Sequence, residues 1–360
     1  MTRERVQLSG YTTLGLGGPA ARFLEAAGDE QVVAAVREAD MNGEPVLILG
    51  GGSNLVVADE GFPGTVIRVT SRGIWPASDG DAVLLAVQAG EDWDPLVEWC
   101  TDEGLSGLEC LSGIPGLAGA TPIQNVGAYG QDVAETVVTV RAYDRHRDAV
   151  VEFGHADCGF GYRTSAFKRA VAGQAMPTGR FVVLGVTFRL SRDPMSAPVR
   201  YGELAACLGV SPGERVPLAT ARAAVLGLRR GKGMVLDPAD PDTRSAGSFF
   251  TNPVLDRRQF ADLERAATAR SGREIVVPHF AAESGQVKVP AAWLIEQAGF
   301  GKGYACGTAR ISSKHTLALT NPGGASTASL IELARQIVAG VHSAFGIQLR
   351  NEPVLVGVAL

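Results

Sequence analysis

Two glycine-rich segments constrain the fold of this chain more than any other feature of its sequence. The first, Gly50-Gly-Gly-Ser-Asn54, directly follows the apolar run 45–49, which has the length and composition of a short buried strand. Consecutive backbone N–H groups in such a loop can point into one concavity that suits a pyrophosphate, and the serine and asparagine add side-chain donors. An ordinary tight turn between two strands explains this segment alone about equally well.

The second segment covers residues 112–130 and strengthens the interpretation as a ligand site. Three of its glycines recur at three-residue intervals, at positions 113, 116 and 119, and Gln124-Asn125 follow with two side-chain amides. Glycines at this spacing let the backbone approach a large flat or phosphorylated ligand closely. A dinucleotide-binding βαβ motif is disfavoured at the earlier run 15–19, because no convincing strand precedes it and a proline lies where a helix would begin.

The composition narrows the class of protein. The chain has 360 residues, of which 46% are hydrophobic and 20% charged, so it can bury a sizeable core and wholesale disorder is excluded. Its length predicts two or three domains. Thirty-three basic against 38 acidic side chains leave a net charge of −5, which argues against a broad nucleic-acid-binding surface but allows a local basic pocket for a phosphorylated small molecule.

The cysteines, histidines and apolar runs exclude further classes. Five widely spaced cysteines without a Cys-x-x-Cys pair predict neither a disulfide framework nor a zinc site, and five scattered histidines show no metal-ligand spacing. The first residues are charged, no apolar signal-peptide stretch follows them, and no apolar run approaches the roughly 18 residues of a membrane span. We therefore expect a soluble, reduced, cytoplasmic protein without a metal ion.

Apolar periodicity predicts a mixed α and β architecture. Helices are expected at residues 26–41, 92–103, 218–228, 256–270, 291–298 and 326–344, and strands at 45–49, 65–69, 82–89, 137–143, 181–190 and 353–358. Because these elements do not alternate strictly, an α+β fold is favoured over a doubly wound parallel sheet. The polar, proline-bearing stretch 192–198 is a candidate domain boundary.

The glycine-rich segments belong to a longer series of motifs. The others are Gly161-Tyr-Arg-Thr-Ser-Ala-Phe-Lys168, Tyr201-Gly-Glu-Leu204, Ala246-Gly-Ser-Phe-Phe-Thr-Asn-Pro253, Lys288-Val-Pro-Ala-Ala-Trp-Leu-Ile-Glu296 and Glu352-Pro353. In this order, and over nearly the whole chain, the series resembles the UDP-N-acetylenolpyruvoylglucosamine reductase family. The glycine loops resemble the vanillyl-alcohol-oxidase class of FAD-binding domains, and Tyr201 favours the family branch that carries a tyrosine loop (type I).

The resemblance implies a domain organisation and a cofactor. A two-lobed FAD-binding domain would cover residues 1–192, with lobes of about 1–70 and 71–192, and an α/β substrate-binding domain would cover 193–360, its last strand returning to the active-site cleft. FAD is expected to bind without a covalent bond, because the candidate tethers His146, His155 and Cys158 lie outside the glycine-loop motifs. The implied protein is a monomer that binds neither nucleic acid nor membrane.

The implied activity is the NADPH-dependent reduction of UDP-N-acetylglucosamine enolpyruvate to UDP-N-acetylmuramate, for peptidoglycan synthesis. In this family hydride passes from NADPH to flavin N5 and then to the vinyl carbon, and the neighbouring carbon receives a proton. By resemblance, Ser248 is the proton donor, while Arg163 and Glu352 stabilise the enolate-like intermediate. A surface salt bridge, a tight turn and a strand edge would explain these three residues if each stood alone.

The resemblance also assigns binding residues. Those for FAD are Gly50, Gly51, Gly52, Ser53, Asn54, Gly113, Ile114, Pro115, Gly116, Gly119, Ala120, Gln124, Asn125 and Gly127. Those for the substrate are Tyr162, Tyr201, Lys232, Asn252 and His315. Thr251 stands where the family often has a lysine, so the resemblance does not extend to a phosphate contact at that position.

Two alternative functions are carried beside this one. A flavin oxidase of the vanillyl-alcohol-oxidase type would keep the fold and change the chemistry, but the Ser248 and Glu352 motifs argue against it. A nucleotide-sugar or flavin-binding protein without catalysis is disfavoured by the joint presence of Arg163, Ser248 and Glu352. A metal-dependent hydrolase or a nucleic-acid module finds no support in ligand spacing or charge.

Overall fold

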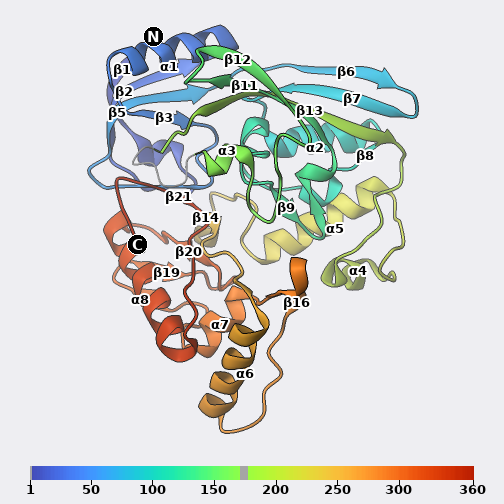
Figure 1. The fold of residues 1–360 in the computed structure, drawn as a ribbon, viewed down its shortest axis with the longest axis vertical. Helices are drawn as coiled ribbons and strands as arrows, with labels where there is room; N and C mark the ends of the chain where they lie inside the picture. Colours follow the sequence, from blue (N-terminus) through green and yellow to red (C-terminus); the bar gives the residue numbers. More distant parts are fainter. Residues whose placement is uncertain (1, 171–176) are drawn as a thin grey trace. The chain divides into compact units, whose positions relative to one another are not determined.

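The computed structural model describes residues 2–170 and 177–360, and these form two compact units that are each discontinuous in sequence. The first unit consists of Met1–Gln7, Pro19–Gly52 and Gly61–Leu236, and the second of Leu8–Gly18, Ser53–Glu60 and Asp237–Leu360. Two short segments near the N-terminus therefore belong to the same unit as the C-terminal third of the chain. Figure 1 labels most of the helices and strands of both units.

The first unit contains a four-stranded sheet with one helix packed on it (Figure 1). The strand order is β1-β2-β5-β3, with β2, β5 and β3 parallel and β1 antiparallel to β2. The strands are β1 Arg3–Gln7, β2 Pro19–Ala26, β3 Val46–Leu49 and β5 Phe62–Val69. Helix α1, Asp29–Met41, packs on β5 through Val32, Val36 and Ala39, which recur at helical spacing and are all buried.

A second, antiparallel sheet forms the larger part of the first unit. Its order is β12-β11-β13-β7-β6, and β8 also pairs with β13. The strands are β6 Ile74–Asp79, β7 Ala82–Gln88, β8 Leu105–Ser106, β11 Val137–Asp144, β12 Ala149–Gly154 and β13 Phe181–Arg192. Strand β13 is buried at every position from Val182 to Val186, so both of its faces are covered.

The remaining elements of the first unit surround the second glycine-rich segment. Helix α5 packs on helix α2 and on the 3-10 turn η2. The elements are α2 Trp93–Asp102, η2 Glu109–Leu111, η3 Ala118–Ala120, β9 Gly127–Ala128, β10 Gln131–Asp132, η4 Val133–Glu135, α3 Ala166–Arg169, α4 Gly202–Leu208 and α5 Leu218–Gly231. The buried face of α5 includes one charged residue, Arg222.

The second unit is built around the long apolar helix α8, Thr327–Phe345. Its sheet has the order β14-β20-β19-β18, a smaller sheet has the order β15-β17-β16, and α6 and α7 pack on α8. The other elements are η1 Leu8–Tyr11, η5 Pro241–Thr243, β14 Ser245–Ser248, β15 Val254–Leu255, α6 Arg257–Ser271, β16 Phe280–Ala281, η6 Glu283–Gly285, β17 Val287–Lys288, α7 Ala291–Gln297, β18 Ala305–Cys306, β19 Ala309–Ile311 and β20 Ala318–Thr320.

The segment 53–60 is fixed in the second unit by its strand and by one carboxylate. Strand β4, Leu55–Val57, pairs in parallel with β21, Val354–Val356. The carboxylate of Asp59 accepts hydrogen bonds from the backbone N–H groups of Thr327 and Ala328, at 2.8 and 2.9 Å, which satisfies two donors in the first turn of α8.

The expected α+β class is confirmed, and the helices and strands expected from periodicity are present with ends shifted by up to three residues. Several elements lie outside the expected set, among them strands β1, β2, β6 and β12 and helix α4. Four of the five residues of β1 are exposed and β6 contains a proline, so neither has the alternating apolar pattern of a half-buried strand. Helix α4 has only seven residues, too few for a clear period.

The compact units divide the chain differently from the domains expected at residue 192. The first unit continues to Leu236, because α5 packs on α2 and α4 packs on α5. The assignment of residues 193–236 to a substrate-binding domain stays a prediction. Among the helices in the described part of the chain, none combines the length and apolar character needed to cross a membrane.

Candidate functional site

The first glycine-rich segment leads from β3 to β4 and touches the second. Gly52 has a φ of +63°, in the left-handed region that glycine adopts most readily. A Cβ added at Gly51 would lie 2.7 Å from the Cα of Gly116, closer than side chains tolerate. The two segments therefore pack backbone to backbone at Gly51. Ser53 and Asn54 begin the segment Ser53–Glu60, which belongs to the second unit.

The residues at the start of α2 hold the second glycine-rich segment. The backbone N–H of Trp93 donates to the carbonyl of Gly116 at 3.1 Å, and its indole N–H donates to the carbonyl of Leu111 at 3.1 Å. Gly113 and Gly116 have φ values of +72° and +128°, and a Cβ at Gly119 would lie 2.4 Å from the Cβ of Ala89. The three-residue glycine spacing thus reflects two left-handed positions and one close contact.

Backbone N–H groups of three predicted FAD-binding residues donate to acceptors within the protein. The N–H of Gly113 donates to Oδ1 of Asp94 at 2.6 Å, and that of Gly119 donates to the carbonyl of Ala89 at 3.0 Å. The N–H of Ala120 donates to the carbonyl of Leu117 at 3.0 Å. We infer that these residues would shape a ligand site by close backbone approach rather than by donating hydrogen bonds to the ligand. Ile114 and Pro115 between them are half-buried.

The two predicted amide side chains also bond within the protein. Nδ2 of Asn125 donates to the carbonyl of Gly161 at 3.0 Å, and its Oδ1 accepts from the N–H of Ala134 at 3.1 Å. Oε1 of Gln124 accepts from Nζ of Lys168 at 2.6 Å. Asn125 therefore supports the turn that carries Arg163, and a direct contact of either amide with a cofactor stays a prediction.

Arg163 lies in the tight turn 161–164, which reciprocal backbone hydrogen bonds of 3.1 and 3.2 Å close. Its φ is +50°, a conformation that costs a residue with a side chain about 1–3 kcal/mol and often marks a functional position. Nη2 donates to the carbonyl of Gly127 at 2.6 Å and Nη1 to that of Asn125 at 3.2 Å, while the carboxylate of Asp132 is 3.9 Å away. Backbone carbonyls thus set the orientation of the guanidinium.

The structure brings Ser248 and Glu352 together in the second unit. Ser248 ends β14, and the carbonyl of the next residue, Phe249, accepts a hydrogen bond from the N–H of Glu352 at 2.9 Å. Phe249 and Phe250 are both 1% exposed, so the backbone between the two motifs is anchored in the core. Ser248 and Glu352 are half-buried, and the Ser248 hydroxyl makes no hydrogen bond to any residue that the structure describes.

Strand β21, which begins two residues after Glu352, lies beside the end of the first glycine-rich segment. The N–H of Val354 donates to the carbonyl of Asn54 at 2.9 Å, and from there β21 runs beside β4. The last strand therefore lies beside the end of this segment, and its return to an active-site cleft stays a prediction. Arg163 belongs to the first unit, so the full set of three reactive residues stays a prediction.

Two of the predicted substrate residues belong to a polar cluster in the first unit. Nζ of Lys232 is 2.6 Å from Oε2 of Glu203 and lies over the ring of Tyr129, and the ring of Tyr201 meets that of Tyr129 edge-on at 5.5 Å. Burial alone would lower the pKa of Lys232, but the hydrogen bond with Glu203 raises it above its usual range. Tyr201 is 40% exposed.

The other predicted substrate residues lie in separate surroundings. Tyr162 is 43% exposed, and its ring lies 5.6 Å from Cζ of Arg163. Oδ1 of Asn252 accepts from the N–H of Ala291 at 2.9 Å, so this side chain caps the start of α7. His315 is half-buried, and its backbone N–H donates to Oγ of Ser312 at 3.3 Å. Substrate contact at all three stays a prediction.

Arg229 is a functional candidate that sequence reasoning missed. Its Nη2 donates to the carbonyl of Met234 at 2.7 Å, but its buried Nε has no hydrogen-bond partner among the described residues. A Cβ at Gly113 would lie 3.4 Å from this Nε. Burial lowers the pKa of Arg229 to about 10, which keeps the group charged at neutral pH. The one available signal was the basic run Arg229-Arg230-Gly-Lys232 at the end of a helix.

Two of the three candidate flavin tethers, His155 and Cys158, are engaged in contacts within the protein. Nδ1 of His155 lies 3.0 Å from the carbonyl of Val137. Cys158 is fully buried, and burial raises the pKa of its thiol to about 11, so the thiolate needed for attack is scarce at neutral pH. Non-covalent binding of FAD stays a prediction. Among the described residues there is no group of three or more His, Cys, Asp or Glu side chains placed to hold a metal ion.

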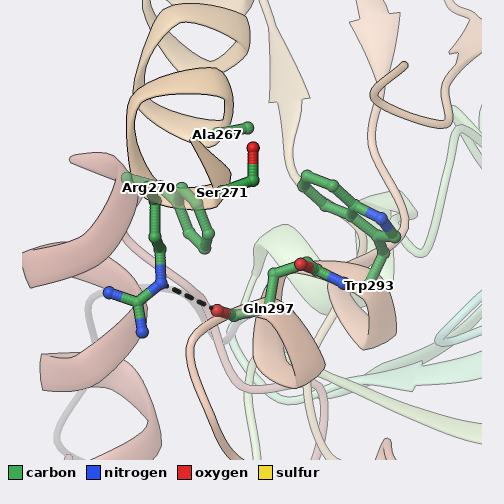
Figure 2. A pocket seen from close by; sticks show the side chains of 6 residues that line it. Ala267, Arg270, Ser271, Trp293 and Gln297 are labelled. Atoms are coloured by element: carbon green, nitrogen blue, oxygen red, sulfur yellow. Dashed lines mark hydrogen bonds between the residues drawn. The ribbon is translucent and has the colours of Figure 1, made fainter. Parts of the chain in front are cut away.

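A small pocket of about 160 Å³ in the second unit contains none of the predicted site residues. Figure 2 shows it among Ala267, Arg270, Ser271, Trp293 and Gln297, with Phe345 completing the lining. Nε of Arg270 donates to the carbonyl of Gln297 at 3.0 Å. The pocket lies where α6, α7 and α8 pack together and holds no cluster of reactive side chains, so we assign it no function.

Comparisons with known proteins match both parts of the chain. Residues 20–153 match a family model described as a FAD binding domain, and residues 238–356 match the model of the UDP-N-acetylenolpyruvoylglucosamine reductase C-terminal domain. The second match begins one residue after the start of the long segment of the second unit, Asp237–Leu360. The match to the first model confirms the expected FAD-binding domain.

Curated relatives match over the whole length of the chain. The UDP-N-acetylenolpyruvoylglucosamine reductase of Thermobifida fusca is 57% identical over 99% of this chain and 98% of its own length. That of Mycobacterium tuberculosis is 48% identical over 99% and 96% of the two chains. The crystal structure of the reductase from Thermus caldophilus superposes with a TM-score of 0.61 at 26% identity, covering 99% of this chain and all of the other.

Proposed function

Because this chain belongs to the UDP-N-acetylenolpyruvoylglucosamine reductase family, we propose that it reduces UDP-N-acetylglucosamine enolpyruvate to UDP-N-acetylmuramate with NADPH as electron donor, in peptidoglycan precursor synthesis. The chain is an oxidoreductase and a flavoprotein that uses FAD. The observation that carries the proposal is the full-length similarity to reductases of this name, at 57% identity over 99% of the chain. A monomeric, cytoplasmic enzyme stays the expectation from the sequence.

The residues around the glycine-rich segments fit a bound FAD. The unpartnered Nε of Arg229 beside Gly113 supplies a positive charge for an anionic part of the cofactor. The contact of Gly51 with Gly116 makes one continuous backbone surface from which the two segments would hold it. When bound, FAD would supply the two-electron chemistry, by which hydride from the reduced nicotinamide reaches the substrate.

Arg163 would orient the enolpyruvyl carboxylate of the substrate. Reduction of an enol ether that carries a carboxylate builds up negative charge on that group in the transition state. A planar guanidinium stays charged at neutral pH and can bind a carboxylate at two points. Because backbone carbonyls of Asn125 and Gly127 already fix its orientation, little reorganisation is needed as the charge develops.

Ser248 would donate the proton that completes the reduction, with Glu352 beside it. A serine hydroxyl is a weak acid, so it gives up a proton only to a strongly basic, well-placed acceptor such as an enolate-like carbon. The backbone hydrogen bond from Glu352 to Phe249 supports this pairing, because Phe249 directly follows Ser248. Glu352 would then stabilise the intermediate together with Arg163.

Lys232 and Tyr201 would bind the nucleotide end of the substrate. The ammonium group suits a diphosphate, and the partly exposed tyrosine ring can cover a bound nucleotide. In the structure this lysine is paired with Glu203, so the diphosphate would have to replace that carboxylate.

The test is a visible spectrum of the purified, FAD-loaded protein without oxygen. We expect NADPH to bleach the flavin band and UDP-N-acetylglucosamine enolpyruvate to restore it. Bleaching without recovery would retain a flavin reductase and reject the substrate. Rapid recovery on admitting oxygen, with none on adding the substrate, would instead favour the oxidase. Absence of a flavin band after reconstitution with FAD would reject the whole proposal.

A further inference from the structure

We propose that Asp94 is a positioning residue for FAD, which both fixes the second glycine-rich segment and sets how much positive charge faces the cofactor from α5. The proposal rests on the proposed role of residues 113–119 in holding FAD. Asp94 lies in the first turn of α2 and appears in none of the sequence motifs described above. It acts through Gly113, Arg222 and Arg229 and is not itself a catalytic residue.

The carboxylate of Asp94 joins the glycine-rich segment to two helices. Oδ1 accepts the N–H of Gly113 at 2.6 Å and Nη1 of Arg222 at 2.6 Å, and Oδ2 accepts Nη2 of Arg222 at 3.1 Å. Charge-assisted, two-point bonds of this kind are directional and strong. The Arg222 side chain is only 9% exposed, so this contact is largely shielded from water. The left-handed turn at Gly113 is thereby locked in position.

One carboxylate faces two guanidinium groups at this place. Burial alone would raise the pKa of Asp94, but the hydrogen bonds from Arg222 and Gly113 and the charges of Arg222 and Arg229 lower it, so the group is ionised at neutral pH. Glu98 also reaches Arg222, at 3.3 Å, from a position 61% exposed to solvent. Asp94 and Glu98 thus bind Arg222, and Arg229 is left with a buried Nε that no group in the described residues satisfies.

This division of charge has a consequence for the redox state of the cofactor. Reduced flavin carries more negative charge than oxidised flavin, so a nearby cation favours the reduced form and a nearby anion disfavours it. Asp94 partly offsets the two arginines and so holds the balance between the forms. A purely structural Asp94, which only ties α2 to α5, would affect the stability of the protein without changing that balance.

The experiment compares Asp94→Asn and Asp94→Ala with the control Asp92→Asn. Asparagine keeps an oxygen for the Gly113 N–H and removes the charge, whereas alanine removes both. Asp92 lies two residues earlier, is 54% exposed and pairs with Arg72 on the surface at 2.9 Å. For each FAD-loaded protein we would measure the affinity for FAD and the ratio of affinities for reduced and oxidised FAD, from the reduction potential. Unfolding of each apoprotein controls for stability.

We expect Asp94→Asn to raise the ratio of reduced to oxidised affinity at least threefold, and Asp94→Ala to weaken FAD binding about tenfold as well. The double variant Asp94→Asn/Arg222→Gln removes both charges and should bring the ratio back to within twofold of the wild type. The control should match the wild type. An Asp94→Asn protein with the ratio and FAD affinity of the control would overturn the proposal, and so would a double variant that keeps the shifted ratio.

The isosteric asparagine variant decides the question if the alanine variant does not fold. Failure of the proposed function is seen separately, in the wild type, as bound FAD that the enolpyruvyl substrate does not reoxidise. That result would leave the measurements on Asp94 and their meaning unchanged, because they use FAD alone.

Discussion

The two compact units hold their predicted reactive residues in different ways. In the first unit, the Arg163 side chain is oriented by carbonyls of residues 125 and 127, in a turn that the side chain of Asn125 supports. In the second unit, Ser248 and Glu352 are placed by backbone hydrogen bonds between segments 249–251 and 350–352. The first arrangement depends on one tight turn and on the side chain of Asn125 that supports it, whereas the second depends on the pairing of two backbone segments. A single substitution beside Arg163 should therefore disturb its reactive residue more than a single substitution beside Ser248 and Glu352 disturbs theirs.

The largest expected effect is on the reactive side chains themselves. Ser248→Ala should retain FAD and its reduction by NADPH, but slow reoxidation by the substrate about 10²–10⁴-fold, the usual contribution of a proton donor. Arg163→Ala and Glu352→Gln should also block reoxidation with FAD bound. Anaerobic stopped-flow absorbance measures each half-reaction, with Ser271→Ala as a serine control outside the site. Reoxidation at the wild-type rate in any of the three would remove that residue from the mechanism.

Two asparagines, one beside Arg163 and one beside Glu352, test directly whether the two sites depend differently on a single supporting side chain. Asn125→Ala removes hydrogen bonds to Gly161 and Ala134 and leaves buried groups unpaired, so we expect a loss of about 1–3 kcal/mol in stability and weaker substrate binding through Arg163. Asn351→Ala removes a single bond to the carbonyl of Pro353 and should cost about 0.5–1.5 kcal/mol. Denaturant unfolding and KM measure both. Equal losses, with equal effects on KM, would contradict the comparison.

A smaller effect is expected at the Lys232–Glu203 ion pair of the first unit. Glu203→Gln removes the carboxylate that competes with an anionic ligand for Lys232, so UDP should bind up to about fivefold more tightly. The gain is small because exposed ion pairs contribute little. Calorimetric titration with UDP at low and high salt measures it. Glu214→Gln, a change at an exposed residue, is the control. Unchanged UDP affinity in Glu203→Gln would show that Lys232 does not bind the diphosphate.

The smallest test concerns thiol reactivity and leaves function untouched. Burial raises the pKa of Cys100 and of Cys110 to about 12, so both thiols stay protonated at pH 8, whereas Cys207 is exposed. A thiol reagent at pH 8 should modify Cys207 first and leave Cys100 and Cys110 intact in the folded protein. Mass spectrometry of the labelled peptides measures the order. Early labelling of Cys100 would show that the core of the first unit opens.

The sequence predicted what depends on local pattern or on a continuous motif. Apolar periodicity located α8 and β13, because each buries a regular set of its own residues. The glycine-rich segments were recognisable as special loops, since left-handed positions such as Gly113 favour glycine. The family motifs led to Ser248 and Glu352, which the structure then placed side by side.

The sequence did not predict what depends on contacts between distant positions. Asp94 and Arg222 are 128 residues apart, and the local sequence around each does not indicate that they form an ion pair. The burial of Arg229 and its unsatisfied Nε follow from the packing of α5 against Gly113. The sequence also gave no sign that the backbone amides of Gly113 and Gly119 donate to Asp94 and Ala89, because these acceptors come close only in the folded chain.

The pairing of β4 with β21 has a consequence for folding during synthesis on the ribosome. Leu55 emerges early in synthesis, yet its partner Val354 is translated about 300 residues later. At roughly 5–20 residues per second, the strand waits on the order of 15–60 seconds for its neighbour. During that time, the exposed edge of β4 is open to pairing with the wrong strand. Chains that end before Val354 would lack this partner altogether, so the edge of β4 would stay unpaired in them.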